Sequence, residues 1–322
     1  MKKRILYIMC MLTNFVLSSC EHKDLCYHHP HMATIKVAFD WTNAPSADPD
    51  GMCLFFYPID EEKNNVQRFD IRGKTGGIIK VQTGKYRVIC YNNDTEAMFF
   101  RGMNHFDTHE GFTREGGIFE SVYGRAVTKA PQAKGAEDEC VMICPDMLYG
   151  CCAFEIEITE SSNTEKLMML YPYELVCTYT YEIRNVKNLK HATQMCGSLS
   201  SMAPSLFFST EDLGTECVTI PLETHSDGIS TITGKFYTFG HHPENITEHR
   251  MLLYIWMDDG NKYYYGSSSE KFNVTEQIHT APDKRHVQII IDGLDLPQPI
   301  EDGSGFDPSV DDWQDVEQDI NM

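Results

Sequence analysis

Residues 34–41, Thr-Ile-Lys-Val-Ala-Phe-Asp-Trp, alternate between apolar and polar side chains. Successive side chains of a β-strand point to opposite faces, so one face of this segment is apolar and the other holds Lys36 and Asp40. A repeat of two residues rich in β-branched and aromatic side chains is typical of a strand with one buried face. The apolar face is formed by Ile35, Val37, Phe39 and Trp41.

The same repeat recurs along the chain, and sustained helical periodicity is scarce before residue 300. Residues 258–261, Asp-Asp-Gly-Asn, separate two such runs and indicate a hairpin turn in which glycine supplies a positive φ. Half-buried strands joined by short turns bury their apolar faces sheet on sheet, so the class predicted is an all-β sandwich. The further runs are 153–159, 175–186, 229–239, 251–257, 262–265 and 286–291.

The chain divides into two parts of sandwich size. Residues 159–164 are polar and follow a strong strand, which marks a boundary. We therefore predict an N-terminal sandwich over 32–160 and a C-terminal sandwich over 166–296. The segments Thr83–Tyr86 and Thr233–Phe236 are similar strand entries, which favours two related sandwiches over one large barrel.

The N-terminus has the features of a bacterial lipoprotein signal. A basic start at Lys2–Arg4 precedes an apolar stretch, 5–17, that suits a secretory signal and is too short to span a membrane. Leu17-Ser18-Ser19-Cys20 then resembles a lipobox, in which the thiol of Cys20 receives a diacylglyceryl group. We predict a signal peptide over 1–19, a tether over 20–31 and an outer-membrane lipoprotein of undetermined face. The alternative is an ordinary secretory peptide with an incidental cysteine.

Composition excludes two classes of protein. The 322 residues are 42% apolar, which is too high for a disordered chain. The formal net charge of −20 disfavours nucleic acid, whose partners need a basic face to displace counterions. After the signal, no apolar stretch approaches the length of a membrane-spanning helix.

Ten cysteines remain after Cys10 in the signal and Cys20. An extracytoplasmic compartment permits disulfides, but several of the ten lie in apolar strand runs, where a free thiol behaves as a small buried hydrophobe. We favour mostly free thiols and assign no pairs. The ten are Cys26, Cys53, Cys90, Cys140, Cys144, Cys151, Cys152, Cys177, Cys196 and Cys217.

No motif predicts a cofactor, a metal or a catalytic site. Residues 26–31, Cys-Tyr-His-His-Pro-His, and the group of His241, His242 and His249 lack the repeated paired spacing of zinc sites. The nucleophile-elbow, zinc-protease and phosphate-loop motifs are absent from the sequence. We therefore expect a non-enzymatic protein without cofactor or metal.

The segment 297–322 forms an acidic tail without lysine or arginine. Its apolar residues are spaced 4, 3, 3 and 4 apart, which predicts a short amphipathic helix. Such a helix is marginal alone in water and needs a surface, which is either its own sandwich or a partner subunit. The five candidate partner-binding residues are Phe306, Val310, Trp313, Val316 and Ile320.

Five further segments carry a resemblance: Cys20–Cys26, Ala33–Trp41, Gly76–Ile79, Gly84–Thr95 and Leu294–Pro297. Together they resemble an uncharacterised family of Bacteroidota lipoproteins related to fimbrillin-like and fimbrium-anchoring lipoproteins. The resemblance implies two tandem transthyretin-like, Greek-key sandwiches and a role in cell adhesion or fimbrial anchoring, with a protein partner bound by strand addition or by the tail. The alternative is a surface glycan-binding lipoprotein for nutrient uptake, with Trp256 and Tyr263–Tyr265 as stacking rings.

Overall fold

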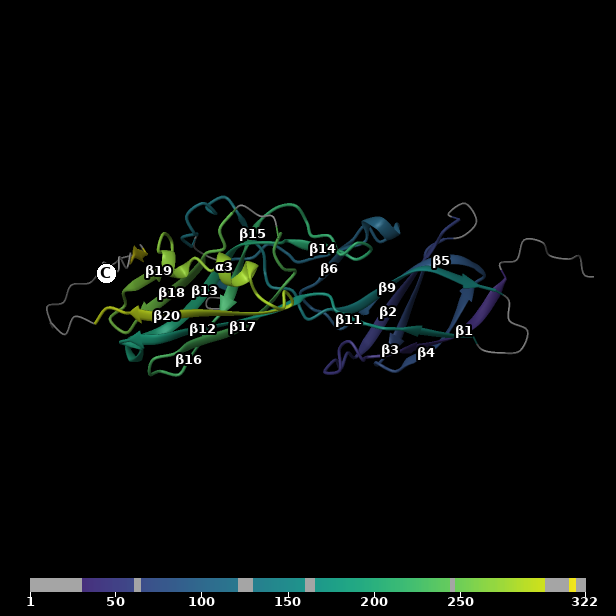
Figure 1. Ribbon diagram of the computed structural model, residues 1–322, viewed down its shortest axis with the longest axis horizontal. Helices are drawn as coiled ribbons and strands as arrows, with labels where there is room; N and C mark the ends of the chain where they lie inside the picture. Colours follow the sequence, from purple (N-terminus) through teal and green to yellow (C-terminus); the bar gives the residue numbers. More distant parts are fainter. Residues whose placement is uncertain are drawn as a thin grey trace, which may run out of the picture.

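The computed structural model describes residues 31–60, 65–120, 130–159, 166–243, 247–298 and 313–316. Figure 1 shows the strands in two groups along the long axis of the molecule, with β1–β5 in one group and β12, β13 and β17–β20 in the other. Among the described residues, no helix combines the length and the apolar character needed to cross a membrane. The short helices are η1 (Phe106–Thr108), η2 (Leu189–His191), η3 (Glu270–Phe272) and α3 (Thr275–His279).

The first sandwich packs a three-stranded sheet on a five-stranded sheet, and side chains of both sheets share one core. The three-stranded sheet has the order β10 (Lys166–Leu170), β1 (Met32–Phe39), β4 (Gly76–Gln82). The five-stranded sheet has the order β11 (Tyr173–Glu174), β9 (Tyr149–Ile158), β5 (Gly84–Asn92), β2 (Gly51–Pro58), β3 (Gln67–Arg72).

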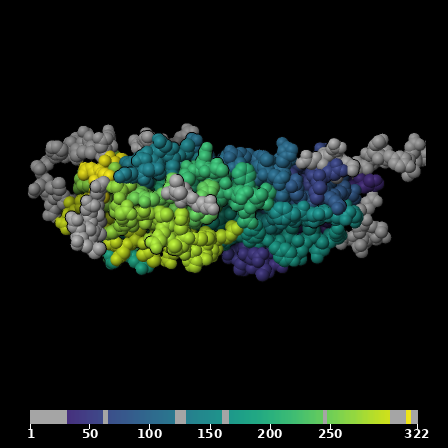
Figure 2. Space-filling view, turned by 45° about the horizontal axis from the view of Figure 1, so that its top comes forward, coloured from purple at the N-terminus to yellow at the C-terminus, as the bar shows by residue number. Residues whose placement is uncertain are grey.

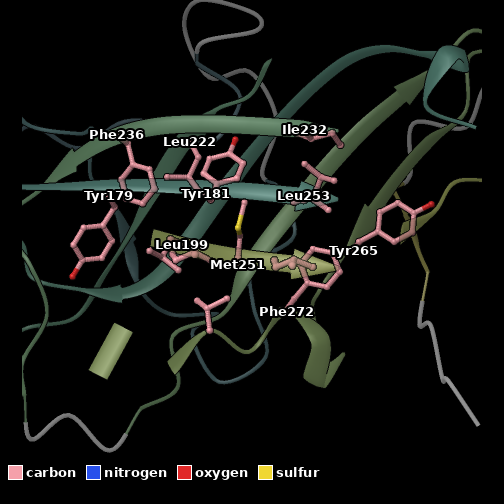
Figure 3. Packing of buried hydrophobic residues seen from close by; sticks show 14 of the residues in the cluster. Tyr179, Tyr181, Leu199, Leu222, Ile232, Phe236, Met251, Leu253, Tyr265 and Phe272 are labelled. Carbon is pink, nitrogen blue, oxygen red and sulfur yellow. The ribbon is translucent and has the colours of Figure 1, made fainter. Parts of the chain in front are cut away.

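The second sandwich packs a four-stranded sheet on a six-stranded sheet. In Figure 3, Tyr179, Tyr181 and Phe236 of the smaller sheet lie over Leu199 and Met251 of the larger one. The smaller sheet has the order β16 (His225–Ser226), β17 (Ile232–Thr238), β12 (Cys177–Lys187), β20 (His286–Asp295). The larger has the order β21 (Gln314–Asp315), β19 (Lys262–Tyr265), β18 (Met251–Met257), β13 (Ala192–Met202), β15 (Val218–Glu223), β8 (Cys140–Val141).

Strand β2 is buried on both faces, and this explains its continuous apolar sequence. One face lies in the core of the first sandwich, and the other contacts a junction core shared with the second half of the chain. A small third sheet covers the junction core: β14 (Ser205–Phe207), β7 (Glu110–Phe112) and β6 (Phe99–Arg101). Because β14 comes from the second half and β6 and β7 from the first, this junction sheet joins the two sandwiches.

Strand β18 is buried on both faces in the same way. Its outward side chains, among them Tyr254 and Trp256, lie under a segment that includes Ile118, Phe119 and 130–136. In Figure 2 the teal-blue part of the chain lies beside the yellow-green part, as this packing requires. The all-β class is thus confirmed, with two sandwiches in tandem and segments exchanged between the halves.

The strand pairing differs from the predicted boundary at 160–166. Strand β10 pairs in parallel with β1, and β11 pairs with β9, so both complete the first sandwich. The strands of the second sandwich begin with β12 at Cys177, and β8 also joins it, in parallel with β15. The pairings of β10 with β1 and of β8 with β15 join residues more than 70 positions apart, so no local pattern near residue 160 indicates them.

The C-terminal helix is not confirmed, and the described part of the tail is extended. Gln314 and Asp315 form β21, which pairs in parallel with Tyr263 and Tyr264 of β19. The free edge of β19 offers backbone hydrogen bonds to an extended chain, whereas a short isolated helix has little stability of its own. The predicted helix is therefore wrong at residues 313–316.

Candidate functional site

The predicted partner-binding residues separate into two groups. Trp313 and Val316 are described and lie against the chain's own second sandwich. Three others, Phe306, Val310 and Ile320, lie outside the described residues, as does the lipidation candidate Cys20.

Trp313 lies in an aromatic cluster. Its ring stacks on Phe119 with 4.9 Å between ring centroids and meets Trp256 edge-on at 4.7 Å. Tyr254 is a third neighbour at 5.5 Å. The backbone N–H of Val316 donates to the carbonyl oxygen of Tyr264 at 3.1 Å. At these residues the tail docks on its own chain, which is one of the two alternatives left open by its sequence.

The second sandwich has a groove on one long side, between β15 of the larger sheet and β17 of the smaller. We call it the β15–β17 groove. Its volume is about 340 Å³, and most of its wall is apolar. The walls are Ile143, Cys144, Pro221, Leu222, Phe236 and Tyr237, and the charged rim is Glu120, Glu223 and Lys235.

One side of the groove is open because Pro221 interrupts strand pairing. Strand β8 pairs with Val218 and Thr219, and the N–H of Met142 donates to the carbonyl oxygen of Thr219 at 3.0 Å. The next pairing position is Pro221, which has no N–H to donate. The Cys144 thiol donates to the carbonyl oxygen of Pro221 at 3.2 Å instead.

The opposite side is open because β16 is only two residues long. It pairs with Ile232 and Thr233, and within the described ranges the sheet order gives β17 no outer neighbour over residues 234–238. The chain leaves β16 through a turn in which the Asp227 carboxylate accepts three backbone N–H bonds at 2.8–2.9 Å. These bonds lower the pKa of Asp227 to about 2, so the turn is held at all physiological pH values.

The groove has the chemistry of a binding surface. Burial raises the pKa of the Cys144 thiol to about 12, so this sulfur stays protonated and is a poor nucleophile. The ammonium of Lys235 lies 5.2 Å from the centre of the Tyr237 ring. An unpaired strand edge beside apolar pockets fits an extended peptide, whose backbone pairs with the edge while alternate side chains enter the pockets. Pro221 is visible in the sequence, but its position just beyond the residues of β15 that pair with β8 is not.

A histidine cluster lies near the junction of the sandwiches. Of the three histidines grouped in the sequence, His241 and His249 lie together, and the third ring of the cluster is His279 of α3 and not His242. The Nε2 atoms of His249 and His279 are 3.1 Å apart, whereas His242 contacts the Gly214 carbonyl oxygen at 2.6 Å. Within the ranges described, no group of three or more potential ligands is arranged to hold a metal ion.

The aromatic residues proposed for glycan stacking are largely occupied within the protein. Tyr265 is 1% exposed and lies in the second sandwich core, against which Tyr263 also packs. Trp256 and Tyr264 belong to the cluster around Trp313. These rings therefore form no open stacking platform.

Two joined sandwiches define a tandem β-sandwich protein. A solved adhesin-assigned structure from Bacteroides ovatus has this fold, with a TM-score of 0.60 and 20% identity over 88% of this chain and 98% of that one. The chain belongs to the family described as Domain of unknown function (DUF5119), which matches residues 19–223.

Two further proteins are similar to the chain. A protein of Bacteroides ovatus assigned as the fimbrium anchoring subunit Fim4B is 24% identical over 199 residues, which are 61% of this chain and 54% of that protein. The chain thus spans about half the length of this curated relative. The fimbrial anchor protein Mfa2 from Porphyromonas gingivalis aligns with a TM-score of 0.43 and 12% identity, over 81% of this chain and 91% of that one.

Proposed function

We propose that this protein is a lipid-anchored component of a fimbrium or adhesin assembly on the cell envelope. An acyl group on Cys20 holds the chain at the outer membrane, and the β15–β17 groove receives an extended strand from a protein partner. The observation that supports this proposal most directly is the edge of β17 left without a strand partner in the described sheet, which lies beside an apolar groove. The similarity to Fim4B supports the fimbrial setting.

The groove has the dimensions of a short strand. Residues 234–238 of β17 lie beyond β16, and five residues of strand extend about 17 Å. An exposed edge of this kind invites pairing with another chain, and natural proteins usually shorten, charge or cover it. Among the described strands on this side of the sandwich, β8 and β16 cover only the ends, which leaves the middle for a partner.

The strand-addition proposal is tested by site-specific photocrosslinking in the host cell. We expect a photoreactive phenylalanine analogue at Tyr237 to form an adduct with a fimbrial subunit, mapped by mass spectrometry to an extended segment. The matched control places the analogue at Phe154, which is 64% exposed on the first sandwich and should give no such adduct. Equal adducts at both positions, or none at Tyr237, would contradict strand addition at this groove.

Anchoring is tested separately from partner binding. Mass spectrometry of the envelope protein should find acyl groups on Cys20, and Cys20→Ala should release fimbriae from the cells into the medium. Cys140→Ala is the matched control, since Cys140 is an exposed free thiol in the second sandwich. An unacylated Cys20 in the mature protein would disprove the anchor but not the strand site.

A further inference from the structure

The outer face of the three-stranded sheet in the first sandwich is unusually apolar for a surface. The described part of the chain exposes eleven large apolar side chains, and four of them lie on this one face. They come from all three strands: Leu167 and Met169 from β10, Met32 from β1 and Ile78 from β4. An exposed apolar cluster of this kind marks a surface that meets another phase or another molecule.

The strand register places lysine among these apolar side chains. Lys36 of β1 is paired on one side with Leu167 and on the other with Ile78, so the three side chains form one row across the sheet. Lys80 lies beside Thr34 in a neighbouring row. We call this surface the apolar–lysine face.

The charge of this face is opposite to that of the chain. The protein has 47 acidic and 27 basic residues, yet β1, β4 and β10 contain no acidic residue. Lys36 and Lys80 are exposed and form no ion pair among the described residues. Asp40, the next carboxylate on that side of β1, follows the end of the strand and accepts a hydrogen bond from the Thr42 N–H at 2.9 Å.

The smaller sheet of the second sandwich provides a comparison. Its outer face exposes mainly polar and charged side chains, including Thr180, Arg184, Gln288 and Asp292, with Ile290 as the one large exposed apolar side chain of its described strands. The two sandwiches therefore differ in the surface that they offer, although each has a small sheet packed on a larger one. Of the two smaller sheets, only that of the first sandwich has an outer face of this kind.

We propose that the apolar–lysine face lies on an anionic phospholipid surface. The lysine ammonium groups bind headgroup phosphates, while Leu167, Ile78 and Met169 enter the boundary between headgroups and acyl chains. The position in the chain agrees with this assignment, because β1 begins twelve residues after Cys20 and twelve residues span at most about 40 Å. The inference deepens the proposed function, since it concerns the membrane to which Cys20 would attach the chain.

The test measures vesicle binding by residues 21–322, which contain every strand of both sandwiches and lack the acylation site. We expect this protein to float with vesicles of phosphatidylglycerol and phosphatidylcholine and not with phosphatidylcholine alone. Lys36→Gln combined with Lys80→Gln should lower the partition coefficient about thirtyfold, because each lysine near such a surface contributes a factor of about five. Leu167→Gln combined with Ile78→Gln should also lower it, with little dependence on salt.

The matched control is Lys187→Gln combined with Lys190→Gln, two exposed lysines of the second sandwich, which should leave the partition coefficient within about twofold. Equal binding by the two lysine pairs, or no binding to anionic vesicles, would overturn the proposal. The proposal would also be overturned if the unchanged protein bound no vesicles and the Lys36 and Lys80 variant lost binding to a protein partner. That result would assign the face to a protein. Because residues 21–322 lack Cys20, the result is independent of whether the natural chain is acylated.

Discussion

Trp313 joins two distant parts of the chain, because its ring contacts Phe119 from the first half and Trp256 from the second. Trp313→Ala should lower the free energy of unfolding by about 2 kcal/mol, since a half-buried aromatic side chain loses most of its contacts. Urea denaturation of the full chain measures this change. Gln314→Ala at the exposed neighbouring position is the control, and equal effects of the two changes would contradict docking of the tail through this ring.

His109 makes the junction core sensitive to acid. It is fully buried, its Nδ1 lies 2.6 Å from the Tyr57 hydroxyl, and burial lowers its pKa to about 4. The unfolded chain, with a histidine pKa near 6.5, binds a proton first, so stability is full above pH 6.5 and is lost as the pH falls towards 4. Burial lowers the pKa of His241 and His249 in the same direction, also to about 4.

We expect the lowered pKa of His109 alone to reduce the free energy of unfolding by about 2 kcal/mol between pH 7 and pH 5. His109→Gln should flatten this part of the stability profile, measured by urea denaturation at a series of pH values. His105→Gln, at an exposed position four residues away, should keep the original profile. A profile that His109→Gln leaves unchanged would show that other groups cause the acid sensitivity.

The buried cysteines should resist alkylation in the native protein. Burial raises the pKa of Cys53 and Cys196 to about 12, whereas Cys140 is exposed. Only the thiolate reacts, so N-ethylmaleimide at pH 7.5 should modify Cys140 first and the two buried thiols only after unfolding. Mass spectrometry of peptides tests this order, and rapid native labelling of Cys53 would contradict it.

At the scale of the elements, the strands predicted correctly are those whose apolar residues recur within the strand itself. Residues 251–257 and 262–265 form β18 and β19 as predicted, and Gly260 has a φ of 85° in the turn between them. At residues 313–316 the predicted helix is wrong: the chain is extended there, and Trp313 and Val316, three residues apart, pack against different clusters. What decides the outcome is the free edge of β19 together with Phe119 and Trp256, which lie far away in sequence.

The β15–β17 groove could not be predicted from the sequence for a similar reason. Pro221 is visible in the sequence, but its effect depends on β8, whose residues Cys140 and Val141 precede their partners Val218 and Thr219 by 78 positions. The similar entries Thr83–Tyr86 and Thr233–Phe236, which suggested duplication, also have different settings. Gly84 begins β5 in a larger sheet, whereas Gly234 lies inside β17 in a smaller one.

Gly234 sets the close approach of β17 to β15. A Cβ at this position would lie 2.2 Å from the Tyr181 ring and 2.6 Å from the Glu223 carbonyl oxygen. The Tyr181 hydroxyl donates to that oxygen at 2.7 Å, so the ring has little freedom to move. Gly234→Ala should therefore lower the free energy of unfolding by about 2 kcal/mol and weaken crosslinking from the groove. Thr233→Ala, at an exposed neighbouring position, should do neither, and tolerance of Gly234→Ala would contradict the close contact.

At the scale of the whole molecule, the junction sheet makes the two sandwiches interdependent. Phe208, which is 2% exposed, stacks on Tyr91 with 5.0 Å between ring centroids and lies 5.1 Å from His109. We expect the native protein to unfold in one transition, because removing either sandwich exposes the junction core. Phe208→Ala should lower the unfolding temperature and separate the transition into two, as measured by calorimetry. Two independent transitions already present in the native chain would contradict this coupling.

The position of β1 determines how the molecule bears tension. In the fimbrial anchor that we propose, tension from outside would enter the described part of the chain at Met32, the first residue of β1. Because β1 lies between β4 and β10, hydrogen-bonded on both sides, the load acts along the strand and shears all of its backbone bonds together. A strand at an edge, or one pulled sideways, would release its bonds one after another at a lower force. The central place of β1 would therefore let the first sandwich resist extraction in the anchor that we propose.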